Sequence, residues 1–435
     1  MRTFLQHYGM LVVLLALGVC FSIATMQEQP TVGDAAGRTL AAHLGKTGSL
    51  VIVAGGTPEE AAFAHAVEAE LMKTGRRAEA MVLGDPKDAR KVLEDLNARG
   101  VALQVLALSQ AASEWMVFSD LRTDFPVLGT PVIVKPRAER WPSFLKRENL
   151  INIANQIAVI AIVAIGMTMV IITGGIDLSV GSLIALSAVM VALLVRDCAG
   201  AEHASAAGML LSGLGAMAVC GLIGAGTGLV VTRFAIPPFI VTLAIMLVAS
   251  GLAFLLAKGQ SIYQVPDSFV TLGRGTDVLG LPNAVVLMLL LYAAAHLFMK
   301  HTAMGRYLYA VGGNREAALV SGLRVSLVLV FAYTVSGLLA GLGGVIMASQ
   351  LKSGSPTYGQ MYELFVIAAV VVGGASLSGG RGRMFGTLIG ALIIAVIQNG
   401  MNLTNIESYT QKVVLGLVIL GAVMLDQLKA GVSVR

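Results

Sequence analysis

Apolar residues form long runs along most of the chain, and short polar segments separate these runs. A helix needs about 20 predominantly apolar residues to cross a bilayer, and ten runs approach or exceed that length. They are residues 8–26, 150–173, 178–196, 207–232, 238–258, 283–300, 326–349, 361–377, 384–402 and 408–426. The pattern predicts an all-α polytopic membrane protein with about ten transmembrane helices.

Residues 27–148 follow a different pattern, in which short apolar runs alternate with charged helical segments. The apolar runs typical of strands are 49–55, 78–84 and 101–109, with 129–136 as a candidate fourth. Thr57 and Glu60 are spaced for a capping box at the start of the first helical segment. Strands that alternate with helices predict a small parallel α/β domain. The glycine pair in "VIVAGGTPEE" is either a plain turn or an anion cradle at a helix start.

Composition supports this division of the chain. Hydrophobic residues make up 56% and charged residues only 13%, against about 25% charged in a typical soluble domain. Residues 27–148 hold 15 of the 30 Lys and Arg residues and 16 of the 25 Asp and Glu residues. We therefore divide the chain into a first transmembrane helix (1–26), an inserted domain (27–148) and a membrane domain (149–435). A cleaved signal peptide is the alternative for the first segment.

Charge and cysteine content exclude several classes of function. The net charge of +5 is spread along the chain, so no nucleic-acid surface is indicated. Cys20, Cys198 and Cys220 have neither metal-binding nor redox spacing, and we predict no metal site. "LGKTG" at 44–48 lacks the first glycine of a phosphate loop, and no G-x-x-x-x-G-K-[ST] motif occurs. We therefore predict that this chain is not an enzyme and carries no ATPase motif of its own.

The distribution of positive charge predicts the orientation in the membrane. Arg306, Arg315 and Arg324 lie in the polar segment 301–325, and two further arginines lie in "GGRGRM". The positive-inside rule places both segments in the cytoplasm. An even number of spans then puts both chain ends in the cytoplasm and the inserted domain outside. A basic stretch opposes this assignment, namely Lys135, Arg137, Arg140, Lys146 and Arg147.

The stretch "GGIDLSVG" (174–181) places an acid, Asp177, between two apolar runs. Asp177 has three readings: a cap on the following helix, a polar group on a transport pathway, or a residue of a water-exposed turn. The stretch is echoed by "GGASLSGG" (373–380) in the pattern G-G-x-x-L-S-x-G. The echo is either a chance match or an internal repeat of the kind found in transporter folds.

The segment 301–325 contains "REAALVSGL", which is able to form a short helix with Asn314 as its cap. A helix of this kind between two spans is either a solvated connector or a docking element for a partner protein.

Several long stretches resemble the membrane permease subunit of bacterial ABC importers for monosaccharides of the ribose/xylose/arabinose/galactose type. They are "NLINIANQ" (149–156), "GMTMVIITGGIDLSVGSLIALS" (166–187), "GRYLYAVGGNREAALVSGL" (305–323), "YELFVIAAVVVGGASLSGGRGRMFGTLIGALI" (362–393) and "QNGMNL" (398–403). The resemblance covers about two-thirds of the chain. It implies a half-channel in the bacterial inner membrane that works as a homodimer or with a sister permease.

The resemblance also implies partners and residue roles. Cytoplasmic ABC ATPase subunits would bind the segment 301–325 as a coupling loop and hydrolyse ATP, so this chain would bind no cofactor itself. An extracytoplasmic sugar-binding protein would deliver the substrate, and membrane lipid would surround the spans. The expected coupling residues are Gly305, Arg306, Gly312, Gly313, Asn314 and Glu316. The expected pathway residues, chosen near breaks and helix ends, are Gln156, Asp177, Ser179, Gln398 and Asn399.

Two features depart from the family pattern. Phe365 stands where the family usually has an acid, which puts the substrate choice in doubt, and the insert at 27–148 replaces a short linker. The insert resembles half of a periplasmic-binding-protein-like or flavodoxin-like sheet and is expected to have an accessory role. The alternatives are an importer for another small polar solute, a secondary transporter and a membrane-anchored enzyme. The sequence does not identify the sugar.

Overall fold

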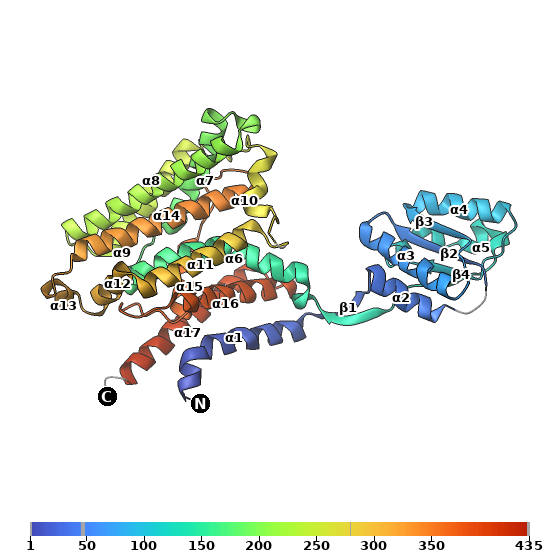
Figure 1. The fold of residues 1–435 in the computed structure, drawn as a ribbon, viewed down its shortest axis with the longest axis horizontal. Coiled ribbons are helices and arrows are strands. Elements are labelled where there is room, and N and C mark those ends of the chain that lie inside the picture. The colour runs from blue at the N-terminus through green and yellow to red at the C-terminus, as the bar shows by residue number, and fades with distance from the viewer. Residues whose placement is uncertain (1, 45–47, 279, 433–435) are drawn as a thin grey trace. The chain divides into compact units, whose positions relative to one another are not determined.

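The computed structural model describes residues 2–44, 48–278 and 280–432, and these form two compact units (Figure 1). One unit combines Met1–Thr25 with Ser143–Arg435, and the other is Met26–Pro142. Residues 143–148, which the sequence assigned to the insert, therefore belong to the first unit. The chain ends, whose cytoplasmic location is predicted, lie outside the described residues.

The first unit is helical. Its helices are α1 (Arg2–Ala24), α6 (Arg147–Ile172), α7 (Val180–Cys198), α8 (Ala206–Arg233), α9 (Pro238–Leu256), α10 (Thr271–Arg274), α11 (Asn283–His301), α12 (Ala303–Gly313), α13 (Arg315–Val320), α14 (Val325–Leu351), α15 (Tyr362–Val372), α16 (Met384–Leu403) and α17 (Ser408–Val432). Within the described residues, seven are long and apolar enough to cross a membrane: α6, α7, α8, α9, α11, α14 and α16. The described parts of α1, α15 and α17 add shorter apolar helices.

One predicted span is wrong in extent. The run at 361–377 forms only the 11-residue helix α15, which ends at Val372. At 1.5 Å per residue, such a helix covers roughly half of the hydrocarbon core. The chain then turns at Gly373 and Gly374, and the next helix begins at Met384.

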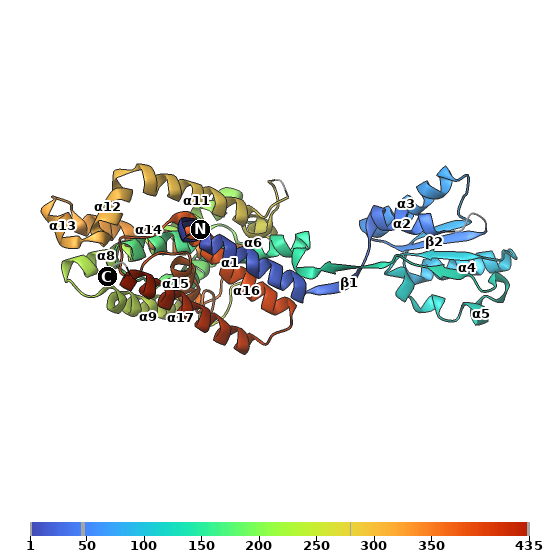
Figure 2. The same ribbon diagram turned by 90° about the horizontal axis from the view of Figure 1, so that it is seen from below.

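Helix α6 is the most deeply buried span, and α14 packs against α6, α7 and α8. In Figures 1 and 2, α14 lies along α8, and glycines allow this close approach. A Cβ atom at Gly224 would overlap the carbonyl oxygen of Tyr333, and one at Gly337 would overlap that of Cys220. Small residues at helix contacts let two backbones approach in a membrane, which accounts for part of the high glycine content.

The second unit contains a four-stranded parallel sheet, as predicted. Its strands are β2 (Leu50–Gly55), β3 (Ala80–Gly84), β4 (Val105–Leu108) and β5 (Val132–Val134), in the order β3-β2-β4-β5. Alternate residues of β2 face two separate cores. Leu50 and Ile52 join a cluster with α2 (Gly33–His43) and α3 (Pro58–Lys73), whereas Val51 and Val53 join one with α4 (Pro86–Ala98) and α5 (Leu121–Asp124).

An antiparallel ribbon of β1 (Met26–Pro30) and β6 (Ala138–Pro142) completes the unit and was not predicted. The predicted capping box at α3 is only half formed. Thr57 Oγ1 accepts a hydrogen bond from the Glu60 amide at 3.3 Å, but the Glu60 carboxylate does not return it. A complete box instead starts α4, between Asp85 and Asp88.

Candidate functional site: two interrupted segments and a polar cavity

The first interruption, residues 173–179, connects α6 to α7 and buries Asp177 almost completely, at 1% exposure. Asp177 Oδ1 accepts hydrogen bonds from the Ser179 amide at 3.0 Å and from Ser179 Oγ at 2.6 Å. Its Oδ2 accepts from Ser336 Oγ of α14 at 2.8 Å. Three donors thus converge on one carboxylate, which joins the N-terminal end of α7 to the middle of α14.

This geometry bears on two of the three readings of Asp177, the helix cap and the water-exposed turn. The cap prediction is wrong in its strict form: Ser179 occupies the cap position, α7 has no side-chain cap, and Asp177 accepts from the Ser179 amide just before the helix begins. Near-complete burial rules out the water-exposed turn. Tyr333 lies beside this network, and its hydroxyl is buried without a hydrogen-bond partner among the described residues.

The second interruption, residues 373–383, connects α15 to α16 and lies against the first. The Gly380 amide donates to the carbonyl oxygen of Ile172, the last residue of α6, at 2.8 Å. A Cβ atom at Gly379 would approach the Gly174 amide nitrogen to 3.1 Å. Thr168 of α6 and Thr387 of α16 share a hydroxyl hydrogen bond of 2.8 Å beside this contact. The two copies of the repeated motif are therefore neighbours in space.

Helix α12 packs into the junction between the two interruptions. A Cβ atom at Gly312 would overlap the Ile172 carbonyl oxygen and lie 2.7 Å from the Gly380 amide nitrogen. Tyr309 Oη donates to the Gly382 carbonyl oxygen at 2.8 Å, and partial burial raises the pKa of this phenol above its usual value. The residue that follows α12, Asn314, caps α13 as predicted, with its Oδ1 accepting from the Ala317 amide at 2.9 Å.

The remaining predicted coupling residues surround this junction. Gly305 is buried against the Met299 backbone, whereas Arg306 and Glu316 are exposed. Gly313 is exposed, and a Cβ atom there would meet nothing within 4 Å. Thus only Gly312 of the glycine pair touches both interruptions.

A third irregular segment, residues 352–361, runs from the end of α14 to α15 alongside α7. Lys352 and Met361 have left-handed backbone conformations at its two ends. A Cβ atom at Gly354 would overlap Ala192 Cβ at 2.5 Å, and one at Gly359 would lie 2.5 Å from the Gly181 carbonyl oxygen. The segment therefore follows α7 from its C-terminal half to its first turn. Non-helical backbone at membrane depth is tolerated where protein buries it or where it lines an aqueous cavity.

This segment lines a cavity of about 320 Å³. Residues of α7 and the middle of α9 close the other sides, and the polar lining includes Ser182, Ser250, Tyr358, Gln360 and Glu363. Within the described residues, the Ser182, Ser250 and Gln360 side chains form no hydrogen bond, and Glu363 forms none to another residue. Their donors and acceptors are available to a ligand.

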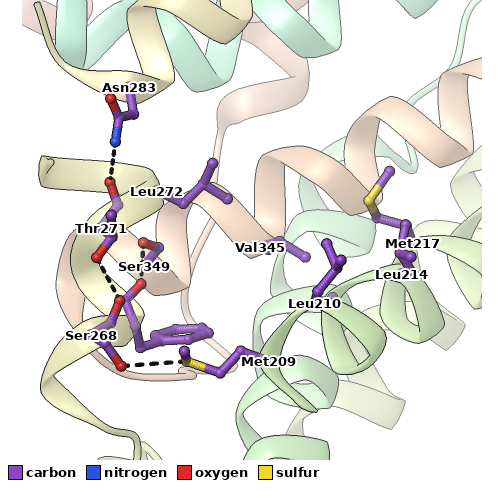
Figure 3. Close-up of a pocket in the computed structure, with 12 residues that line it drawn as sticks. Met209, Leu210, Leu214, Met217, Ser268, Thr271, Leu272, Asn283, Val345 and Ser349 are labelled. Carbon is purple, nitrogen blue, oxygen red and sulfur yellow. Dashed lines mark hydrogen bonds between the residues drawn. The ribbon is translucent and has the colours of Figure 1, made fainter. Parts of the chain in front are cut away.

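A second cavity, of about 360 Å³, has different chemistry (Figure 3). It lies between α8, α14, α10 and the short helical turn before α10, and its lining is mostly apolar. Its polar side chains are engaged with the protein: Asn283 Nδ2 donates to the Thr271 carbonyl oxygen at 2.9 Å, and Ser349 Oγ donates to that of Phe269 at 2.6 Å. A polyol would find few free partners there.

Sequence reasoning identified the interruptions but missed the residues of the polar cavity. Of the predicted pathway residues, Gln156 is exposed on α6, Gln398 is half-buried on α16, and Asn399 exchanges hydrogen bonds with Asn149 at 2.8 and 3.0 Å. Asp177 and Ser179 belong to the buried network described above. The sequence feature that could have indicated the cavity is the polar stretch "SGSPTYGQM", which contains Gly and Pro and lies between two apolar runs.

The position of the anion cradle considered for the α/β unit holds a carboxylate of the chain itself. Glu60 Oε2 accepts from the Gly55 amide at 2.8 Å and from Ser109 Oγ, which bridges the ends of β2 and β4. These ends flank the point where the strand order reverses, the usual ligand site of such sheets. The Gly55 amide and the Ser109 hydroxyl are therefore already engaged, and the charge of Glu60 would repel an anion.

Comparisons with known proteins agree with the helical unit. A family profile described as "Branched-chain amino acid transport system / permease component" matches residues 149–423. The ribose import permease protein RbsC of Bacillus subtilis is 44% identical over 315 residues, which cover 70% of this chain and 92% of that protein. RbsC of Escherichia coli K12 is 44% identical over 66% of this chain and 88% of its own length.

The D-allose transport system permease protein AlsC of Escherichia coli K12 is 34% identical over 66% of this chain and 85% of its own length. No solved structure matches the chain. The family profile covers more than half of the chain and includes both interruptions, the polar cavity and α12–α13. The chain therefore belongs to this family of ABC-importer permease components.

Proposed function

We propose that this chain is the permease subunit of an ATP-driven importer and that a monosaccharide crosses the membrane through the polar cavity. The observation that carries the proposal is the unwound segment 352–361, which brings free polar side chains to the middle of α9. Discontinuous membrane segments near the bilayer midplane are typical substrate sites in transporters. The names of the relatives that import ribose and allose support a sugar substrate.

The chemistry of the cavity also favours a sugar over an amino acid. No Lys, Arg or His lines it among the described residues, so an α-carboxylate would find no cationic partner. Glu363, Gln360 and the two serines instead offer the carboxylate, amide and hydroxyl groups that bind sugar hydroxyls. Phe365 does not line the cavity and packs edge-on against Tyr362 with ring centroids 6.3 Å apart. Its effect on substrate choice remains a prediction.

We further propose that cytoplasmic ATPase subunits dock on α12 and α13 and move both interruptions together. Leu319 and Val320 of α13 are 54% and 90% exposed, an apolar surface suited to a protein partner. A displacement of α12 would be transmitted to α6 through Ile172 and to the segment before α16 through Gly380, because Gly312 contacts both of these residues. Hydrolysis of ATP would belong to the partner, so this chain would bind no cofactor.

The same proposal places the chain in the bacterial inner membrane with ten spans and the α/β unit outside. One of these spans would combine the unwound segment 352–361 with the short helix α15. The basic segment 301–325 favours a cytoplasmic location for α12 and α13. A second copy or a sister permease would complete the pathway, and an extracytoplasmic sugar-binding protein would deliver the substrate. The α/β unit would serve as an accessory domain on that side.

Uptake of labelled sugars by cells that express the complete importer tests the pathway. Glu363→Gln and Gln360→Ala should each reduce uptake at low sugar concentration by about tenfold or more, since each removes hydrogen bonds to the substrate. Ser268→Ala, in the apolar cavity, is the matched control and should leave uptake unchanged. Normal uptake in both cavity variants would overturn the pathway. Uptake that persists without the ATPase subunit would favour the secondary transporter.

A further inference from the structure

The apolar cavity of Figure 3 has no part in the proposed pathway, although it is as large as the polar one. Its lining includes Met209, Leu210, Leu214 and Met217 of α8, which face Leu272 and Val345. Leu210 and Leu214 are 64% and 50% exposed. In a membrane, side chains exposed on this apolar helix meet lipid acyl chains, so the cavity is open to lipid.

Most polar groups around the cavity bond to the protein, which leaves few partners for water. The Gly273 amide donates to Ser349 Oγ at 2.8 Å, and Thr271 Oγ1 donates to the Ser268 carbonyl oxygen at 2.8 Å. Ser268 Oγ finds only the thioether of Met209, at 3.9 Å. Water needs two to four polar partners to occupy a cavity, whereas an acyl chain needs none.

A cation follows the lining residues Thr271 and Leu272 closely along the chain. Arg274 ends α10, two residues after the lining residue Leu272, and its Nε donates to the carbonyl oxygen of Gln350 at the end of α14. Arg274 is exposed, and no acidic partner for its guanidinium occurs among the described residues. The neighbouring cation Lys352 is paired with Asp267. The remaining guanidinium nitrogens of Arg274 therefore form no ion pair within the described residues and are available to a phosphate.

We propose that the apolar cavity binds one acyl chain of a membrane phospholipid and that Arg274 binds the phosphate of the same lipid. The cavity starts at the end of the helical unit where α8 and α11 begin and α14 ends, which is where a headgroup and the first part of a chain would lie. Arginine matches phosphate through its planar set of donors. The proposal requires only that these helices span a membrane, and it is independent of the sugar.

Photo-crosslinking tests the acyl-chain site. The complete importer is reconstituted with phosphatidylglycerol that carries a diazirine in its acyl chain, and labelled peptides are mapped by mass spectrometry. We expect preferential labelling of Met209–Met217 and Phe269–Leu272. Gly213→Leu should reduce this labelling several-fold, because a Cβ at Gly213 points to Val345 Cγ1 at 3.5 Å without meeting backbone. Gly226→Leu, on the same helix where a Cβ meets nothing within 4 Å, is the matched control.

Arg274→Gln tests the headgroup contact in the same preparation. It should lower labelling by the phosphatidylglycerol probe while thermal stability stays unchanged. Even labelling along the exposed face of α8 that Gly213→Leu does not alter would overturn the proposal. Labelling seen in the isolated subunit but lost in the complete importer would also overturn it, because a second protein copy would then cover the cavity.

Discussion

The two interrupted segments share a sequence pattern but are held in place by different means. In the first, a buried carboxylate collects three hydrogen bonds and joins α7 to α14. In the second, the equivalent position is Ser376, which is half-exposed and forms no side-chain hydrogen bond among the described residues. Backbone hydrogen bonds hold this segment instead. The Ser376 amide donates to the Arg381 carbonyl oxygen at 3.0 Å, and the Gly379 amide donates to the Ser376 carbonyl oxygen at 3.0 Å.

This difference indicates which interruption is internally rigid and which is able to change its conformation. Breaking the first would leave buried polar groups without partners, at about 1–3 kcal/mol for each group. The second interruption is held by backbone hydrogen bonds, and its glycines accept many conformations. We therefore expect the second interruption to change its conformation when α12 moves both, and the first to move as a rigid unit.

The largest effect is expected at Gly312, where both interruptions meet. Gly312→Ala places a methyl group against the Ile172 carbonyl oxygen and the Gly380 amide nitrogen, which are hydrogen-bonded to each other. Overpacking of this kind costs about 1–3 kcal/mol. Unfolding in detergent should show this loss, and stimulation of the partner ATPase should fall sharply. Gly313→Ala adds the same methyl group in open space and should change neither property. If the two variants behave alike, the contact between α12 and the interruptions contributes neither to stability nor to coupling, which would contradict the prediction.

Asp177→Ala should have the next largest effect. It leaves the Ser179 amide and the Ser336 hydroxyl without their acceptor in a buried site, which costs about 1–3 kcal/mol for each group. Asp177→Asn keeps an acceptor oxygen of the same size and should lose less. Denaturant titration of the purified protein measures both variants. If Asn destabilises the protein as much as Ala does, the charge rather than the hydrogen bonds supports the first interruption.

Ser336→Ala removes a single bond of the network and should cost about 1 kcal/mol. Because Ser336 and Asp177 act on each other, the double variant with Asp177→Ala should lose less than the sum of the two single losses. A double-mutant cycle of unfolding free energies measures this coupling. Additive losses would mean that the α7–α14 connection is not a network.

Ser376→Ala should have the smallest effect, within about 0.5 kcal/mol, because its side chain forms no hydrogen bond in the described structure. The same unfolding assay applies, with Asp177→Ala as the reference at the equivalent position. A loss as large as that of Asp177→Ala would show that the second interruption is also fixed by its side chains.

Local patterns predicted much of the fold. Alternation and breaks located β2, β3, β4 and β5, and Asn314 was correctly identified as the cap of α13. Predictions failed where a side chain had a choice of distant partners. Glu60 is spaced to close the capping box at Thr57, but it binds Gly55 and Ser109, and Ser109 is 49 residues away in sequence. Spacing along the chain does not reveal such a competitor.

The sequence by itself determined that this protein has apolar spans, a parallel α/β insert and two matching interruptions, because hydrophobic period and turn residues act locally. Tertiary structure alone decided that the two interruptions touch, that only Gly312 of the glycine pair reaches both, and that residues 352–361 unwind beside α7. It also decided that Ser182, Gln360 and Glu363 line one cavity, and that Asn399 exchanges hydrogen bonds with Asn149. These outcomes depend on which helix faces pack together, and packing joins residues that lie far apart in the chain.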